Sequence, residues 1–152
     1  MTLSVAVRFG TRRPWVPAGK RMAEWARLAA GRRASGRELA ILVVTSAESR
    51  RLNRDYRGKD RPTNVLSFEG TAAPGAPKVL GDLAICAGVV AREAREQKKS
   101  LAAHWAHMVV HGTLHLLGYD HEDAADARRM ERRERTVLAG LGFADPYGHE
   151  RG

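Results

Sequence analysis

Five histidines between residues 104 and 121 constrain this chain more than any other feature of its sequence. The segment HWAHMVVHGTLHLLGYDH carries them at His104, His107, His111, His115 and His121. At 100° per residue, the first four fall within an arc of about 80° on one helix. Packing alone seldom places four histidines on one helical face. The segment therefore indicates a helix that carries a functional site.

Spacing and a glycine select three of these histidines as metal ligands. Two histidines four residues apart can bind one metal ion, and the helix offers the pairs His107/His111 and His111/His115. Gly118 can end the helix in a left-handed conformation, after which His121 folds back onto the last turn. That turn carries His115. We therefore predict a metal site formed by His111, His115 and His121 at the C-terminal end of the helix.

Three neutral histidines leave a fourth coordination position for water, which is the arrangement of catalytic rather than structural zinc. Imidazole suits zinc, and the geometry also admits nickel, cobalt or copper. His104 and His107 would then support the ligands, face the substrate or lie on the surface. The sequence alone leaves these three roles open.

The motif lacks a residue that zinc proteases use. In their HExxHxxGxxH pattern the glutamate is the general base, and Gly112 stands at its position here. Met130 lies inside a charged helical run, so it makes no convincing Met-turn. A metal could deprotonate its bound water unaided, or Asp120 could act as the base. Asp120 also suits a turn or a role in supporting a ligand.

A basic segment, RRLNRDYRGKDRPTN, spans residues 50 to 64 with six basic and two acidic side chains. Cleavage of a phosphodiester needs cations that neutralise the phosphate in the transition state, and Tyr56 adds a ring on which a base can stack. A solvated charged loop explains the same composition. The net charge of +9 suits a polyanionic partner, either nucleic acid or an anionic membrane surface.

Further basic residues between positions 12 and 37 leave a similar choice. They suit a second RNA-facing patch or an ordinary charged surface. These residues are Arg12, Arg13, Lys20, Arg21, Arg27, Arg32, Arg33 and Arg37.

Alternating helix and strand signals predict one domain over residues 1–152. Apolar patterns predict strands at 2–9, 38–45, 64–69 and 79–86. Helices are expected at 18–31, 46–56, 87–98, 101–117 and 122–140, with Ser46 as an N-cap and a Glu131–Arg135 pair on a solvated last helix. The class is α+β, a four-stranded mixed sheet packed by about five helices, with the metal site at the C-terminal end of a central helix.

Three remaining features concern the cellular compartment and a mobile loop. We find no signal peptide and no membrane span, and the single cysteine, Cys86, is expected to be a small buried hydrophobe. Both observations suit a cytoplasmic protein. Residues 71–77, TAAPGAP, are expected to form a mobile surface loop.

Three segments together resemble the YbeY family of bacterial rRNA maturation factors. They are HGTLHLLGYDH, LNRDYRGKDRPTNVLSF and LGDLAIC, in the order and at the separations typical of the family. The similarity extends through HWAHMVVHG and the DPY near the C-terminus, and covers roughly residues 40 to 147. The first 37 residues match only in general layout.

The resemblance implies a small α+β metalloprotein that is a single-strand-specific, metal-dependent endoribonuclease. In this family the activity serves 16S rRNA 3′-end maturation and ribosome quality control. The zinc ligands implied are His111, His115 and His121, and the functionally important arginine is Arg57.

We therefore expect one zinc ion, and single-stranded rRNA of the small ribosomal subunit as the partner. Arg57 is expected to bind or stabilise the scissile phosphate, while Lys59 and Arg61 help to hold the strand. Two other functions stay open: a metallohydrolase of another substrate, such as a metzincin-like protease that Gly112 disfavours, or a zinc-containing, non-catalytic RNA-binding assembly factor. Also open are the nucleophile (metal-bound water or the RNA 2′-hydroxyl), the cleavage site, the oligomeric state and any ribosomal-protein or GTPase partner.

Overall fold

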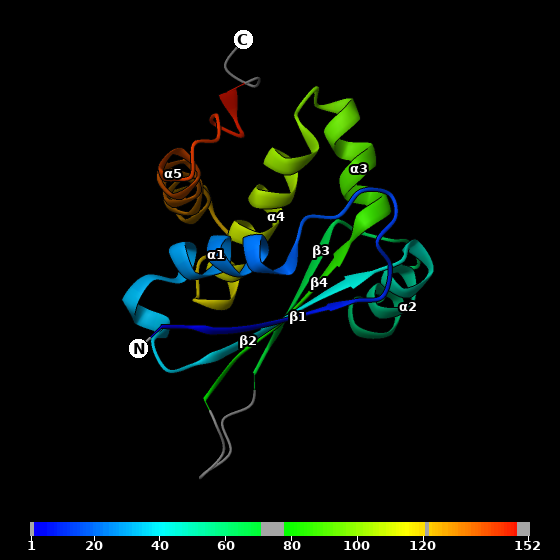
Figure 1. Ribbon diagram of the computed structural model, residues 1–152, viewed down its shortest axis with the longest axis horizontal. Helices are drawn as coiled ribbons and strands as arrows, with labels where there is room; N and C mark the ends of the chain where they lie inside the picture. The colour runs from blue at the N-terminus through cyan, green and yellow to red at the C-terminus, as the bar shows by residue number, and fades with distance from the viewer. Residues whose placement is uncertain (1, 71–77, 121, 149–152) are drawn as a thin grey trace.

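A four-stranded mixed sheet lies at the centre of the molecule (Figure 1). Its strands are β1 (Ser4–Phe9), β2 (Glu38–Val44), β3 (Val65–Glu69) and β4 (Val79–Cys86), in the spatial order β1-β2-β4-β3. β1, β2 and β4 run parallel, and β3 is antiparallel to β4. The computed structural model describes residues 2–70, 78–120 and 122–148, so the loop predicted at 71–77 lies outside the described residues.

The apolar patterns explain which strands are central. β2 and β4 are covered on both faces, and Ile41, Leu83 and Ile85 are fully buried. β1 is an edge strand whose alternate side chains are partly buried, as its alternating sequence predicts. Cys86 ends β4 and is fully buried, which confirms its expected role as a small hydrophobe.

Helices cover both faces of the sheet (Figure 1). On one face, α1 (Gly19–Ala30), α4 (Leu101–Leu116) and α5 (Ala124–Gly140) share the main core with β1, β2 and β4. A short 3₁₀ helix, η1 (Gly31–Ala34), follows α1. On the other face, α2 (Ser46–Arg57) and the start of α3 (Ala87–Glu96) border a smaller apolar cluster. The predicted α+β class is therefore confirmed.

Helix α4 is the central helix of the fold. It packs against β3, β4, α1, α3 and α5, and the indole of Trp105 on this helix is fully buried. Ser100 caps its N-terminus, because the Ser100 hydroxyl accepts a hydrogen bond from the backbone N–H of Ala103. None of the helices in the described part of the chain combines the length and the apolar character needed to cross a membrane.

One predicted detail of the helix ends is wrong. Thr45, not Ser46, is the N-cap of α2, since the Thr45 hydroxyl accepts from the backbone N–H of Glu48 and Ser46 is already helical. The last helix begins at Ala124, close to its predicted start, with Asp123 as its N-cap. At each of these two helix starts the side chain of the capping residue accepts from an otherwise free N–H group of the first turn.

Candidate functional site

Gly112 allows helix α4 to lie directly on the sheet. A Cβ atom at this position would be 2.7 Å from Leu83 Cδ2, closer than packed atoms approach, and 3.3 Å from Val65 Cγ2, tighter than most such contacts. Position 112 therefore faces the apolar surface of β3 and β4. A glutamate here could not reach solvent or a substrate, which explains why the glutamate of the protease motif is missing.

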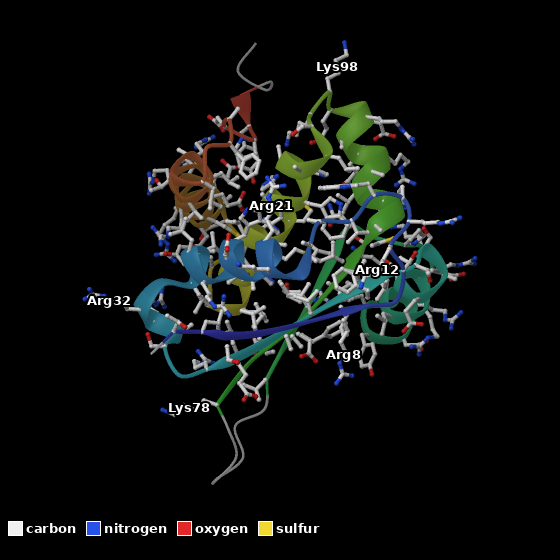
Figure 2. The ribbon with its side chains drawn as sticks, in the orientation of Figure 1. Arg8, Arg12, Arg21, Arg32, Lys78 and Lys98 are labelled. Carbon is white, nitrogen blue, oxygen red and sulfur yellow. The ribbon has the colours of Figure 1, made fainter. Side chains whose placement is uncertain are left out.

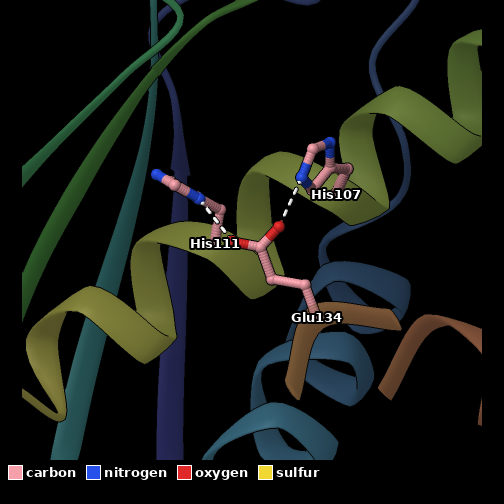
Figure 3. Close-up of side chains that lie close together, drawn as sticks. All are labelled: His107, His111 and Glu134. Atoms are coloured by element: carbon pink, nitrogen blue, oxygen red, sulfur yellow. Dashed lines mark hydrogen bonds and ion pairs between the residues drawn. The ribbon is translucent and has the colours of Figure 1, made fainter. Parts of the chain in front are cut away.

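A buried carboxylate from α5 joins two histidines of α4 (Figure 3). Glu134 Oε1 lies 2.7 Å from His111 Nδ1, and Glu134 Oε2 lies 2.7 Å from His107 Nε2. The hydroxyl of Tyr147 donates to the same Oε2 at 2.5 Å. Glu134 is fully buried. Its two oxygens are thus held by groups from α4 and from the chain beyond α5.

Burial and hydrogen bonds shift the pKa values of Glu134 and His107. Burial by itself raises the pKa of Glu134, but the hydrogen bonds from His107 and His111 outweigh it, so the net pKa lies well below the ordinary value. Burial lowers the pKa of His107, despite its hydrogen bond to Glu134. At neutral pH we therefore assign an ionised carboxylate to Glu134 and a neutral imidazole to His107.

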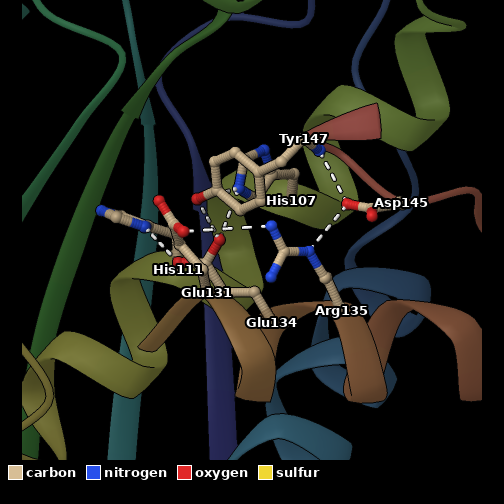
Figure 4. A network of polar contacts seen from close by, with 7 residues as sticks. All are labelled: His107, His111, Glu131, Glu134, Arg135, Asp145 and Tyr147. Carbon is tan, nitrogen blue, oxygen red and sulfur yellow. Dashed lines mark hydrogen bonds and ion pairs between the residues drawn. The ribbon is translucent and has the colours of Figure 1, made fainter. Parts of the chain in front are cut away.

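A second layer of contacts ties the C-terminal segment to this group (Figure 4). Asp145 Oδ1 accepts from Arg135 Nε at 3.1 Å and from the backbone N–H of Tyr147 at 2.8 Å. The Arg135 guanidinium also lies 5.2 Å from the centre of the Tyr147 ring. The predicted Glu131–Arg135 pair is confirmed, with 3.9 Å between Arg135 Nη2 and Glu131 Oε2.

His104, nearer the N-terminus of α4, has its own carboxylate partner, Glu93 on α3. His104 Nε2 lies 2.9 Å from Glu93 Oε1, and Asn64 Nδ2 donates to the same carboxylate at 3.0 Å. His104 is 2% exposed and His107 is 7% exposed. Neither is a surface residue, so that alternative for these two histidines is wrong.

Two of the predicted metal ligands, His111 and His115, lie in the C-terminal part of α4. His111 and His115 are partly exposed on successive turns. Gly118 follows with φ of 102°, the positive value expected for the predicted turn. Asp120 accepts a hydrogen bond from the backbone N–H of Glu122 at 2.9 Å, which supports its role as a turn residue. His121 lies outside the described residues, so the three-histidine set stays a prediction.

The described residues also contain a group that can hold a metal ion. The ligand atoms of His107, His111 and Glu134 lie within 4.8 Å of one another. His111 takes part in both this group and the predicted set. Because His111 Nδ1 faces Glu134, its Nε2 points the other way (Figure 3). Zinc-binding histidines are commonly arranged in this way, with one ring nitrogen on a carboxylate and the other on the ion. The orientation of His111 therefore fits a zinc site.

The six basic side chains of residues 50 to 64 divide into two sets. Arg50, Arg51 and Arg54 form ion pairs with neighbouring acids. The other three, Arg57, Lys59 and Arg61, instead line a cavity of about 150 Å³. Within the described ranges of the chain, no carboxylate pairs with any of these three. They are thus available to bind an anion.

Local structure holds this basic cavity in shape. Gly58 ends α2 with φ of 69° and turns the chain back on itself. The hydroxyl of the buried Ser49 accepts from Thr63 N–H at 2.9 Å and donates to the Thr63 carbonyl at 3.1 Å. Asn53 Nδ2 donates to the carbonyl of Arg61 at 2.9 Å. Residues 58–64, which follow α2, are therefore anchored by hydrogen bonds, while the side chains of Arg57, Lys59 and Arg61 stay exposed to solvent.

Two hydrogen bonds link the cavity to the histidine helix. Arg57 Nη2 donates to the carbonyl of Ser67 on β3 at 3.1 Å. The Ser67 hydroxyl in turn lies 3.5 Å from the carbonyl of Gly112, which follows His111. The guanidinium and the predicted ligand are far apart in sequence but lie near the same edge, where β3 meets α4.

The labelled basic residues between positions 12 and 37 are spread across the molecule (Figure 2). Arg12 and Arg32 lie on opposite sides of the view in Figure 2, and Arg21 lies between them. Arg33 approaches the end of α4. With Arg129 it flanks the Tyr119 ring, at 6.0 and 5.8 Å from guanidinium carbon to ring centre, beside a cavity of about 280 Å³.

Sequence reasoning missed Glu134, because the charge pattern of the last helix predicts a solvated helix. The residue does lie at helical spacing from the buried Met130, Val137 and Leu138, so it belongs to the apolar stripe of α5. A glutamate on such a stripe signals a buried partner. Glu93 and Tyr147 were missed because their partners, His104 and Glu134, lie 11 and 13 residues away along the chain.

Comparisons with known proteins agree on one family. The model of the family described as "Endoribonuclease YbeY" matches residues 19–142. A curated protein of that name from Halorhodospira halophila is 56% identical over 135 residues, covering 86% of this chain and 88% of its own. Another, from Alkalilimnicola ehrlichii, is 63% identical over 125 residues, covering 80% and 75%. A third, from Stenotrophomonas maltophilia, is 52% identical and covers 98% and 96%.

A solved structure matches the fold. The solution structure of a Thermotoga maritima protein superposes with a TM-score of 0.55 at 23% sequence identity, covering 95% of this chain and 97% of that one. At this identity the match concerns the arrangement of helices and strands alone. It agrees with the sheet and the helix layers described above.

Proposed function

The chain belongs to the YbeY family, and on that premise we propose that it is a metal-dependent endoribonuclease that cleaves single-stranded RNA. One observation supports the site in particular. The basic cavity of Arg57, Lys59 and Arg61 is joined through Ser67 to the helix that carries His111 and His115. Cations that can hold a phosphate thus lie beside histidines that can hold a metal ion.

We further propose that the metal is one zinc ion held by His111, His115 and His121. The orientation of His111, whose Nε2 is directed away from Glu134, and the turn at Gly118 both support this set. A bound zinc ion supplies a Lewis acid for a phosphate oxygen and lowers the pKa of a bound water. The group of His107, His111 and Glu134 is the rival set, but its atoms already satisfy one another at hydrogen-bond distances of 2.7 Å.

Arg57 would bind the scissile phosphate. Its guanidinium is exposed and is oriented by the hydrogen bond to Ser67, so it can offer its remaining N–H groups to an anion. Lys59 and Arg61 would hold the neighbouring backbone from the same cavity. Tyr56, 68% exposed and packed edge-on against Phe68, offers a ring face to an unpaired base.

Just beyond the C-terminal end of α4, Arg33 and Arg129 would extend the contact with RNA. Their guanidiniums flank Tyr119 two residues before His121, so a strand passing the predicted metal site would reach them. By family resemblance, the substrate would be rRNA at the 3′ end of 16S, on the small ribosomal subunit in the cytoplasm. The net charge of +9 favours such a polyanionic partner.

Cleavage of a single-stranded RNA by purified protein tests this proposal. Wild type would be compared with His115→Ala and Arg57→Ala, with zinc content measured for each. We expect His115→Ala to lose both zinc and cleavage, and Arg57→Ala to keep zinc but lose cleavage. Arg54→Ala is the matched control, because Arg54 precedes Arg57 on α2 by three residues but pairs with Asp55 outside the cavity.

The termini of the products identify the nucleophile. A 2′,3′-cyclic phosphate would show attack by the RNA 2′-hydroxyl, whereas its absence throughout the reaction would favour water. If all variants cleave equally, the activity is a contaminant. In that case the non-catalytic RNA-binding factor becomes the better description. Cleavage of a peptide library would support the protease alternative, which the burial of Gly112 disfavours.

A further inference from the structure

We propose that Glu134 is a positioning residue for the metal centre, and this inference rests on the proposed function above. Its carboxylate, itself held by His107 and Tyr147, keeps the proton of His111 on Nδ1 and directs the Nε2 lone pair toward the metal. Nothing in the sequence motif assigns Glu134 a role, since it lies 13 residues beyond His121 on a different helix.

With Glu134 ionised, the hydrogen bonds around it place a proton on the nitrogen of each histidine that faces it. An ionised carboxylate accepts hydrogen bonds and donates none. Each group within hydrogen-bond distance of Glu134 must therefore donate, so His107 carries its proton on Nε2 and His111 carries its proton on Nδ1. A neutral imidazole with its proton on Nδ1 has its only lone pair on Nε2, which is the atom that can bind a metal.

The carboxylate cannot easily turn away from His111. Glu134 Oε2 already accepts from His107 at 2.7 Å and from the Tyr147 hydroxyl at 2.5 Å, which leaves Oε1 for His111. The side chain is fully buried, so water cannot replace these partners. Because two groups hold one oxygen, the other oxygen has a defined position, and the ring of His111 is oriented by it.

The contacts that hold Glu134 in place extend into the C-terminal segment. Tyr147 reaches Glu134 because Asp145 accepts from its backbone N–H and from Arg135, which lies on α5 one residue after Glu134 (Figure 4). The DPY sequence at 145–147 therefore closes a loop of contacts that begins and ends on α5. Its contribution to the metal centre passes through Glu134, and Tyr147 need not touch the metal.

Glu134 acts on a ligand, His111, and is not itself a ligand. Were Glu134 a ligand, its oxygens would point at the ion, and the hydrogen bonds to His107 and His111 would break. A positioning role keeps both bonds and predicts weaker metal binding, rather than none, when the charge is removed. Removal of such a partner commonly lowers metal affinity about 10- to 100-fold.

Zinc affinity measured by competition with a chromophoric chelator provides the test. We expect Glu134→Gln to bind zinc about 10- to 100-fold more weakly than wild type. Glu93→Gln is the matched control, because Glu93 also bonds a buried histidine of α4, namely His104, but does not contact His111. We expect it to bind zinc like wild type. Tyr147→Phe should weaken binding less than Glu134→Gln, since His107 still holds Oε2.

A second measurement needs no variant and so does not depend on whether Glu134→Gln folds. Nitrogen NMR shifts of the histidine rings in metal-free wild type report which nitrogen carries the proton. We expect His111 to be protonated on Nδ1. A proton on Nε2 of His111, or unchanged zinc affinity in folded Glu134→Gln, would overturn the inference. So would complete loss of zinc in Glu134→Gln together with full retention in His115→Ala.

Failure of the proposed function has a different signature. If wild type binds no zinc, or if zinc-loaded wild type leaves RNA intact, the proposed activity fails whatever Glu134 does. If wild type binds zinc through His115 and cleaves RNA, while Glu134→Gln matches it in affinity and proton position, only the inference about Glu134 fails.

Discussion

Replacing Gly112 by glutamate would restore the protease-like HExxH pattern, and we expect it to damage the fold without adding peptide cleavage. Position 112 faces the sheet, where the nearest side-chain atoms belong to Leu83 and Val65. Leu83 is fully buried, so it cannot turn into solvent to make room. The new carboxylate would be placed against apolar side chains without a cation.

The size of the effect follows from two steps. Adding a methyl group in Gly112→Ala gains about 1 kcal/mol of helix propensity but overpacks the core, which typically costs about 1–3 kcal/mol. With a Cβ only 2.7 Å from Leu83 Cδ2, we expect a net loss of about 1 kcal/mol in the free energy of unfolding. Gly112→Glu adds an unpaired buried charge, and we expect a total loss of about 3–5 kcal/mol.

Urea unfolding followed by circular dichroism measures both changes. Gly140→Ala is the control, because a Cβ there meets only Leu28 Cδ2, at 4.0 Å, and we expect it to be neutral or to stabilise by about 0.5 kcal/mol. A Gly112→Glu protein as stable as wild type would refute the packing argument. The missing glutamate would then need a catalytic explanation.

Three further predictions concern RNA, metal and pH. The double variant Arg33→Ala/Arg129→Ala should bind RNA more weakly in filter-binding experiments. The slope of log affinity against log salt concentration should fall by about one for each phosphate that is no longer neutralised. An unchanged slope would show that these arginines do not bind RNA. Zinc at about 100 times its dissociation constant should raise the free energy of unfolding by about 2.7 kcal/mol, and a melting temperature insensitive to zinc or chelator would contradict a native metal site. Although burial raises the pKa of Glu93, hydrogen bonds from His104 and Asn64 lower it overall. Its contribution to stability should therefore be present above the ordinary value of 4.5 and be lost as the pH falls below it, so that Glu93→Gln shows a flatter acid limb in unfolding experiments.

Local patterns in the chain were sufficient to predict the elements and the position of the histidines. The strands of the sheet and the five helices lie close to their predicted ranges, because apolar periodicity depends on which side chains share a face. The spacing of His111 and His115 places them on successive turns for the same reason. Gly118 has the positive φ that its position after the helix suggested.

The basic segment shows where such reasoning stops. Its composition predicted a phosphate site and a solvated loop equally well. In the structure Asp60 pairs with Arg50 across ten residues, while Arg57, Lys59 and Arg61 face a cavity that Thr63 and Asn53 help to line. Which arginines are neutralised depends on how the loop folds back onto α2, and composition contains no information about that fold.

The histidine helix shows the same division at the site itself. Sequence alone determined that four histidines share one face and that the glutamate of the protease motif is absent, since both follow from the order of residues and the 3.6-residue turn. Only the tertiary structure decided that Gly112 is pressed against Leu83 and that Glu134 of α5 holds His107 and His111. The first two depend on the geometry of a single helix. The others depend on what that helix packs against, and long-range packing brings together residues that no local pattern connects.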